Sequence, residues 1–228
     1  MQPRTLPSLS DRLSTSVQPT DRITPFVSLS DYSAGGLIHE TALHYDSALR
    51  FGPVHKTVAE SCPATWVAQR LSTALGKARD TTSVERPIHI GAPTTALSHR
   101  NTAKACQATL SEYNECTQEV CLIFDDAALA TSPRDTITAL GALRGAGFRL
   151  GINAQRSWLS LKSTSALLMV DAVWISAAHL DLEDDLMSGL RELRDAGIQV
   201  ICFDAAWSCA NEYLAAGVTH VFRAKSDA

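Results

Sequence analysis

The sequence predicts an α/β protein that folds as a TIM-like (β/α)8 barrel with an antiparallel first strand. Three segments run from a helix through Ala-Gly into a short strand rich in β-branched or aromatic residues, at Gly147, Gly197 and Gly217. Glycine suits the left-handed residue that ends a helix, because it has no Cβ to clash. About eight strands are mostly separated by helices, and right-handed connections between them close most simply into a barrel.

The antiparallel pair is predicted at the start of the domain. Two strand-like segments, ITPFVSL at 23–29 and GGLIHETAL at 35–43, are separated by the turn-rich Ser-Asp-Tyr-Ser-Ala-Gly. Because so short a connection does not allow a crossover, these two strands should be antiparallel. Residues 1–22 are rich in Ser, Thr, Pro, Arg and Asp, which is typical of a flexible arm. We therefore divide the chain into an arm at 1–22 and one barrel domain at 23–228.

The first helical region is predicted at 54–78, and Pro63 should divide it. Its apolar residues recur at every fourth position and give a narrow buried face, formed by Val67, Leu71 and Leu75. A strand at 86–91 and a helix at 101–113 should follow.

The next unit begins with EVCLIF at 119–124, a nearly all-apolar run that is typical of a strand buried on both faces. Ser132 should then cap a helix that has proline at its first position and an acid three residues after the cap. This helix ends at Gly147, and its apolar face is formed by Ile137, Leu140 and Leu143. A short strand at 148–152 should follow, with a turn beginning at Asn153.

Three strands and one helix complete the predicted barrel. LLMVDAVWIS at 167–176 has the pattern of a buried strand, and the segments 193–203 and 214–222 each end in one. The helix is predicted at 182–196, with acids at its start, arginines toward its end and an apolar stripe formed by Leu186, Leu190 and Leu193.

Composition disfavours two classes of partner. The formal charge of −4 and a pI near 5.9 give no basic field to hold a nucleic-acid backbone. No apolar stretch approaches the roughly 18 residues of a membrane span, and the first residues lack the apolar region of a secretory signal. We therefore expect no nucleic-acid or membrane partner and a cytoplasmic location. The six cysteines form no Cys-x-x-Cys pair and are interpreted as reduced and structural.

Segments in this order and spacing resemble the EAL domain, the bacterial cyclic-di-GMP phosphodiesterase barrel, over about residues 23–225. ITPFVSL resembles the opening strand of that family, and HETALHY lies where its Glu-Ala-Leu signature belongs. VCLIFDDAAL is similar to the Glu-x-Thr-Glu strand end. LRGAGFRLGINAQRSWLSL with VDAVWIS resembles the stretch that holds the Asp-Asp-Phe-Gly loop and the Lys-x-Asp strand, and VICFDAAWSCANEYLAAG resembles the final Ala-Glu-Gly-Val-Glu region.

The resemblance implies that the enzymes of this family hydrolyse the phosphodiester with two divalent cations. These cations need several oxygen ligands at the strand ends to generate hydroxide from water. The signature glutamate corresponds to Thr41 in this chain. A shift of one residue would place a glutamate there instead, but would turn its side chain to the other face of the strand. The asparagine ligand corresponds to Gly91 and the strand-end glutamate to Ile123. The paired loop aspartates correspond to Asn153 and Ala154.

The remaining motif positions have also changed. The catalytic lysine corresponds to Trp174 and the acid that follows it to Ser176. The two glutamates of the last motif correspond to Phe203 and Ala206. The resemblance therefore implies a degenerate EAL domain that lacks the metal ligands and the lysine of the enzymes.

Only Asp126 keeps the expected type of side chain, and two interpretations of it are open. It belongs to the Asp125–Asp126 pair that follows a strand, where carboxylates commonly bind nearby backbone N–H groups. Alternatively, Asp126, Asp204 and Arg156 are residual contacts for a ligand. Two carboxylates alone make a weak magnesium site unless substrate phosphates complete it. We therefore expect no metal and no cofactor.

These expectations favour a catalytically inactive regulatory protein that acts through a protein partner in bacterial signalling, in the control of motility or biofilms. The class of partner comes from the resemblance, because noncatalytic EAL-like proteins act in this way. A receptor that binds cyclic-di-GMP without hydrolysing it is the alternative, and an active phosphodiesterase is the third interpretation. A homodimer is left open, since EAL enzymes commonly dimerise near the loop that is rewritten here after Ile152.

Overall fold

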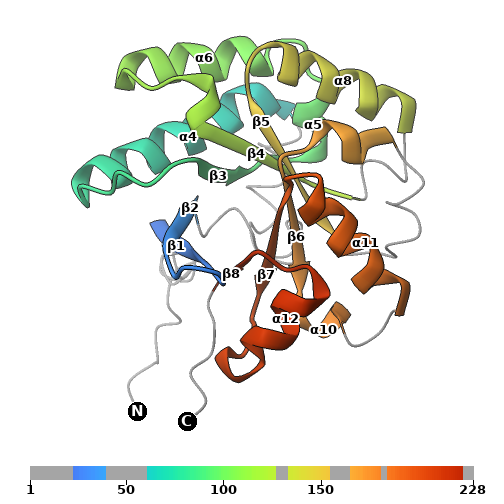
Figure 1. The fold of residues 1–228 in the computed structure, drawn as a ribbon. Coiled ribbons are helices and arrows are strands. Elements are labelled where there is room, and N and C mark those ends of the chain that lie inside the picture. Colours follow the sequence, from blue (N-terminus) through green and yellow to red (C-terminus); the bar gives the residue numbers. More distant parts are fainter. Residues whose placement is uncertain (1–22, 40–60, 127–132, 155–164, 181–183, 223–228) are drawn as a thin grey trace, which may run out of the picture.

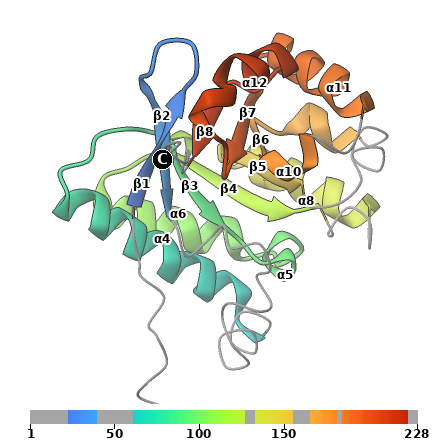
Figure 2. The ribbon, with the colours of Figure 1, turned by 90° about the horizontal axis from the view of Figure 1, so that it is seen from below.

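The computed structural model describes residues 23–39, 61–126, 133–154, 165–180 and 184–222. Within them, eight strands form one closed barrel in chain order, from β1 to β8 (Figure 1). Helices cover the outside of the barrel, with α4 and α6 on one side and α11 and α12 on the opposite side (Figure 2). The predicted α/β barrel is therefore confirmed. No described helix is both long enough and apolar enough to cross a lipid bilayer.

The first strand is antiparallel to both of its neighbours. Strand β1 (Ile23–Ser28) pairs with β2 (Ala34–His39), and it closes the barrel by pairing with β8 (His220–Phe222). All other neighbouring strands are parallel. The prediction of an antiparallel start is confirmed, and its cause is the short turn between β1 and β2.

The other strands end at one rim of the barrel, which we call the mouth. They are β3 (Ile88–Gly91), β4 (Val120–Asp125), β5 (Arg149–Ala154), β6 (Ala172–Ser176) and β7 (Gln199–Phe203). The end of β8 and the start of β1 lie at the same rim, because β1 runs in the opposite direction. Ligands of parallel α/β barrels bind at this end.

Helices and short 3-10 turns connect the strands. The α-helices are α4 (Pro63–Asp80), α5 (Thr94–Leu97), α6 (Thr102–Tyr113), α8 (Pro133–Gly145), α10 (Ala177–Leu180), α11 (Asp184–Asp195) and α12 (Ala210–Ala216). The 3-10 turns are η2 (Thr117–Glu119), η3 (Ser165–Met169) and η4 (Trp207–Cys209).

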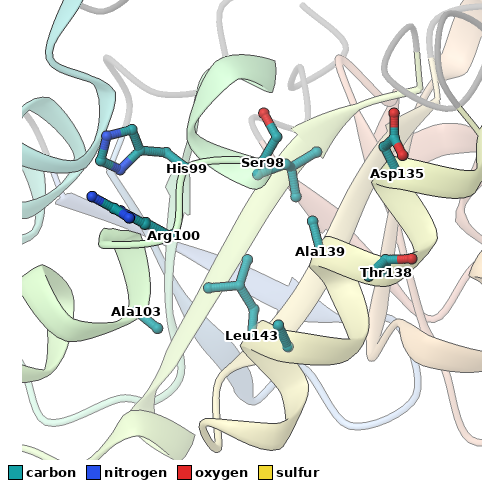
Figure 3. A pocket seen from close by; sticks show the side chains of 10 residues that line it. Ser98, His99, Arg100, Ala103, Asp135, Thr138, Ala139 and Leu143 are labelled. Atoms are coloured by element: carbon teal, nitrogen blue, oxygen red, sulfur yellow. The ribbon is translucent and has the colours of Figure 1, made fainter.

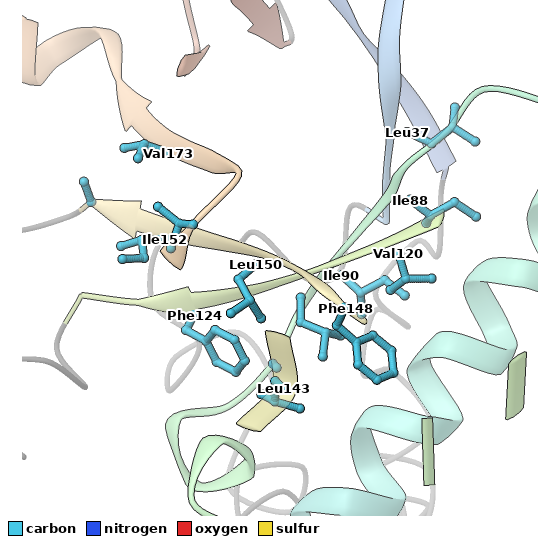
Figure 4. Close-up of a cluster of buried hydrophobic side chains, with 14 of the residues drawn as sticks. Leu37, Ile88, Ile90, Val120, Phe124, Leu143, Phe148, Leu150, Ile152 and Val173 are labelled. Carbon is cyan, nitrogen blue, oxygen red and sulfur yellow. The ribbon is translucent and has the colours of Figure 1, made fainter. Parts of the chain in front are cut away.

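The larger hydrophobic core lies between the strands and the surrounding helices. Figure 4 shows part of this layer, where Leu143 of α8 and Phe148 lie near Leu150 of β5. Most of the predicted apolar helix residues are buried in it, and Ile137 is half-buried against it; the buried ones are Val67, Leu71, Leu75, Leu140, Leu143, Leu186, Leu190 and Leu193. A second, smaller cluster fills the inside of the barrel. The amphipathic pattern thus predicted correctly which helix faces pack on the sheet.

The three glycine joints have the backbone conformation that the sequence predicts. Gly147, Gly197 and Gly217 have φ angles of +93°, +82° and +107°. Gly217 is also constrained by space, because a Cβ there would lie 2.5 Å from the backbone nitrogen of Arg191 on α11. Glycine is therefore required at Gly217 for both its conformation and its close approach to a neighbouring helix.

Several predicted boundaries are wrong. Residues 167–169 belong to η3 and not to a strand, and Leu168 is 84% exposed. An apolar run alone does not distinguish a strand from a helical turn. Strand β5 continues through Ala154, so no turn begins at Asn153. In contrast, Pro63 stands at the first position of α4, directly after a bend at Cys62, which agrees with the predicted division of the helical region at this residue. The parts of the predicted elements at 40–43 and 54–60 lie outside the described residues.

Candidate functional site

Six of the positions matched to catalytic motifs lie on the inner face of the barrel near the mouth. Ile123, Trp174 and Phe203 belong to the cluster that fills the barrel. Residues paired in register on neighbouring strands face the same side of a sheet. Gly91 pairs with Ile123, Asn153 with Trp174, and Ser176 with Phe203, so all six face inward.

Trp174 occupies the centre of this interior. Its side chain is fully buried, and its indole Nε1 donates a hydrogen bond to Nδ1 of His89, 3.1 Å away on β3. The rings of Phe26 and Phe222 meet Trp174 edge to face, with centroids 5.7 Å and 5.8 Å away. The large indole and its aromatic neighbours therefore fill the space at this level of the barrel.

His89 is held in its neutral form. Burial removes water from the ring and lowers its pKa to about 3, and the charges of His220 and Arg149 act in the same direction. Because Nδ1 accepts the indole proton, the ring proton of neutral His89 is on Nε2. This Nε2 has no hydrogen-bond partner in the described part of the chain. A neutral histidine whose hydrogen bond goes to the Trp174 indole adds little polarity to the interior.

A polar pair lies at the rim above this apolar interior. Asn153 is 4% exposed, and its Nδ2 donates to Oδ1 of Asp125 at 3.1 Å. Asn153 Oδ1 has no hydrogen-bond partner within the described residues. The turn interpretation of the Asp125–Asp126 pair misses this role of Asp125, although its spacing of two from the inward Ile123 already indicates that it faces inward.

Asp126 continues the chain directly after β4. It is 5% exposed, and its backbone nitrogen donates to the carbonyl of Asn153 at 3.2 Å. This bond ties Asp126 to the end of β5, which agrees with either interpretation of its carboxylate. Its burial is the more informative observation, because a carboxylate in a solvated turn is normally exposed.

The last motif follows β7. Asp204 is half-buried, has a left-handed φ of +56°, and donates its backbone N–H to Phe222 at 3.2 Å. Ala206 precedes η4, and its N–H donates to the hydroxyl of Tyr213 at 3.4 Å. These contacts anchor the loop after β7 onto β8 and α12.

Not every sequence-predicted site residue reaches the interior. Ala154 is buried in the outer core, on the helix side of β5, so the paired positions Asn153 and Ala154 face opposite sides. Thr41 and Arg156 lie outside the described residues. Two of the undescribed ranges directly follow β2 and β5, so the described residues make up only part of the mouth.

Potential metal ligands in the described part of the chain lie apart, and several of its thiols are buried. Within these ranges, no three side chains of His, Cys, Asp or Glu come together to hold a metal ion. Cys121 and Cys202 are buried, as the sequence predicts, and burial raises the pKa of the Cys202 thiol to about 12. Burial raises the pKa of the Cys121 thiol as well. A thiol that stays protonated at neutral pH is a poor nucleophile.

No protein-family model and no curated protein matches the sequence significantly, but solved structures match the fold. The Klebsiella pneumoniae BlrP1 calcium and cyclic-di-GMP complex has a TM-score of 0.66 at 16% identity, and the match covers 87% of this chain and 52% of that chain. The Xanthomonas citri FimX EAL domain, in complex with cyclic-di-GMP, has a TM-score of 0.62 at 18% identity, covering 87% and 83%. The chain has the EAL-domain fold.

The EAL enzyme Bd1971 in its cGMP-bound form matches with a TM-score of 0.61 at 14% identity, covering 87% of this chain and 58% of that one. This chain thus spans little more than half the length of several of the proteins it matches. In this EAL fold, the six inward positions matched to catalytic motifs carry two hydrogen-bonding side chains, Asn153 and Ser176, beside Gly91 and three large apolar residues.

Proposed function

We propose that the chain is a catalytically inactive, EAL-like regulatory protein that acts by binding another protein in bacterial signalling. The observation that carries the proposal is the burial of Trp174 at the position matched to the catalytic lysine. Its indole is hydrogen-bonded to His89 and enclosed by aromatic rings. A lysine at this position would bring a positive charge into the site. The indole of Trp174 instead provides a neutral, packed apolar surface.

Hydrolysis of a phosphodiester by two cations requires oxygen ligands at the strand ends. At the matched positions on β4 and β7, Ile123 and Phe203 provide none. Asn153 offers an amide where an aspartate is matched, and this amide already donates to Asp125. These side chains support an inactive site. The choice of motility or biofilm control as the pathway comes from the EAL resemblance alone.

Assay of the purified chain with cyclic-di-GMP tests the inactive site directly. We expect no hydrolysis above a protein-free control with magnesium or manganese. Metal-dependent turnover that Asp126→Ala abolishes and Glu212→Ala leaves unchanged would show an active phosphodiesterase instead. Glu212 is a suitable control because it is exposed on α12 and is not a position matched to a catalytic motif.

A receptor for cyclic-di-GMP is the second candidate. Several of the matching structures are complexes with this dinucleotide, including the PaMucR phosphodiesterase complex. Calorimetric titration separates the candidates. Saturable heat without turnover would favour the receptor, whereas the absence of heat at concentrations that saturate a control receptor would favour the protein-binding regulator.

A further inference from the structure

A groove of about 350 Å³ lies on the outside of the barrel, between the connection from α5 to α6 and helix α8 (Figure 3). We call it the α6–α8 groove, and its lining includes Arg100, Ala103, Asp135, Ala139, Ala142 and Leu143. The groove belongs to the helical layer and uses none of the inward positions at the mouth. Its size is at the lower end of the range for ligand-binding pockets.

Small side chains create this groove. Ala103 at the start of α6 faces Ala139 and Ala142 of α8 across it, where larger residues would fill the space between the helices. Leu143 contributes an apolar surface at its base. The alanines therefore leave room for apolar side chains from another segment.

The rim of the groove carries charges of opposite sign. In Figure 3, Arg100 lies on one side of the apolar surface and Asp135 on the other, with Ala139 and Leu143 between them. Both charged residues are exposed. An occupant that fits this rim carries apolar side chains together with one acidic and one basic group.

Residues 8–14 of this chain, Ser-Leu-Ser-Asp-Arg-Leu-Ser, have that composition. Asp11 and Arg12 are adjacent and lie between Leu9 and Leu13. Their charges are complementary to Arg100 and Asp135 respectively. This pairing leaves the two leucines for the apolar part of the groove.

The N-terminal segment joins the barrel at the end where helix α8 begins. Residues 1–22 join the barrel at Ile23, which pairs with His39 at the mouth end. Helix α8 follows β4 and begins near the same end, with Asp135 in its first turn. The ten residues from Leu13 to Ile23 extend to about 33 Å. A domain of this size has a radius of gyration of about 17 Å.

We propose that residues 8–14 dock in the α6–α8 groove, with Leu9 and Leu13 against the alanines and Asp11 and Arg12 paired with Arg100 and Asp135. This contact covers a surface that is distinct from the mouth. It does not depend on whether the barrel hydrolyses or binds a dinucleotide. A docked segment makes the groove inaccessible to other proteins until it is displaced.

The rate of thermolysin cleavage before Leu13 in the full chain measures the docking. The protease cleaves the segment only when it has left the groove, so the rate reports the undocked fraction. Ala142→Trp should fill the groove at an exposed position and accelerate cleavage about tenfold, equivalent to about 1.4 kcal/mol. Gly141→Trp is the matched control, since its Cβ meets nothing within 4 Å, and cleavage should stay within about twofold of the wild type.

Charge exchange tests the pairing itself. Arg100→Glu should accelerate cleavage, and adding Asp11→Arg should restore the protection. Equal cleavage of the wild type and Ala142→Trp would overturn the proposal. Protection of the Leu13 site from cleavage that disappears when the protein is diluted would also overturn the proposal, because the groove would then be occupied by the segment of a second copy of the chain.

A second measurement leaves the barrel unaltered. The Leu9→Ser, Leu13→Ser double variant changes only the proposed occupant. It should shift the NMR methyl signals of Ala103 and Ala139 if the segment docks. Unchanged signals at both alanines would contradict the docking even if the tryptophan variants fold poorly.

Discussion

Lowering the pH should destabilise the barrel through His89 at its centre. The pKa of His89 is about 3 in the folded chain, against an ordinary value of 6.5. The unfolded chain therefore binds a proton at a higher pH than the folded chain does. The stability from the neutral ring is present above pH 6.5 and is lost as the pH falls toward 3.

The size of this effect follows from the two pKa values. One pKa unit corresponds to 1.36 kcal/mol, so the full loss is about 5 kcal/mol near pH 3. At pH 5 the same relation gives a loss of about 2 kcal/mol. Typical domains have unfolding free energies of about 5–15 kcal/mol, so this loss is measurable. Protonation at Nδ1 would also break the bond from the Trp174 indole.

Urea unfolding followed by tryptophan fluorescence at pH 7.5 and pH 5 provides the assay. His89→Phe removes the titrating ring and keeps its approximate volume. At pH 7.5 this variant should be less stable by about 1–3 kcal/mol, because the Trp174 N–H loses its acceptor. Its further loss between pH 7.5 and 5 should be about 2 kcal/mol smaller than that of the wild type.

Acid-sensitive groups that do not interact with His89 are common to both proteins and cancel in this comparison. His220 interacts with His89 through its charge, and its own pKa is lowered by burial, against the opposing charge of Asp31. If the wild type and His89→Phe lose equal stability between pH 7.5 and pH 5, protonation of His89 does not lower the unfolding free energy. That result would refute the picture of a dry, apolar interior around Trp174.

Further predictions concern Trp174 and two glycines. Trp174→Lys should destabilise the fold by several kcal/mol without restoring activity, because the charge would be buried among aromatic rings; retained stability in urea unfolding would contradict this. Gly217→Ala should cost about 1 kcal/mol or more, since its φ is +107° and its Cβ would meet α11. Gly141→Ala in α8 should instead stabilise by up to about 1 kcal/mol, and equal denaturation midpoints for both glycine variants would refute the distinction.

Local chemistry in the sequence was sufficient to predict most of the fold. The all-apolar EVCLIF run corresponds closely to β4, and the Ala-Gly joints mark helix ends at three places. Each of these signals depends only on residues that are close together in the sequence. The segment 167–169 shows their limit, because an apolar run there forms a 3-10 turn next to α8 and exposes Leu168.

The interior of the site was harder to predict because it depends on contacts between distant strands. His89 and Trp174 are 85 residues apart, and nothing local to either one indicates their hydrogen bond. Strand alternation could have shown that Asp125 faces inward with Ile123. It could also have shown that Asn153 and Ala154 face opposite sides, once β5 was known to include them.

The antiparallel first strand makes this barrel suitable for circular permutation. β1 and β8 are hydrogen-bonded neighbours, with Val27 paired to Val221, so Ile23 and Phe222 emerge at the same rim. A short linker can therefore join these two residues without crossing the barrel. New ends could then be opened in the turn between β1 and β2, at the opposite rim, where Tyr32 is 71% exposed.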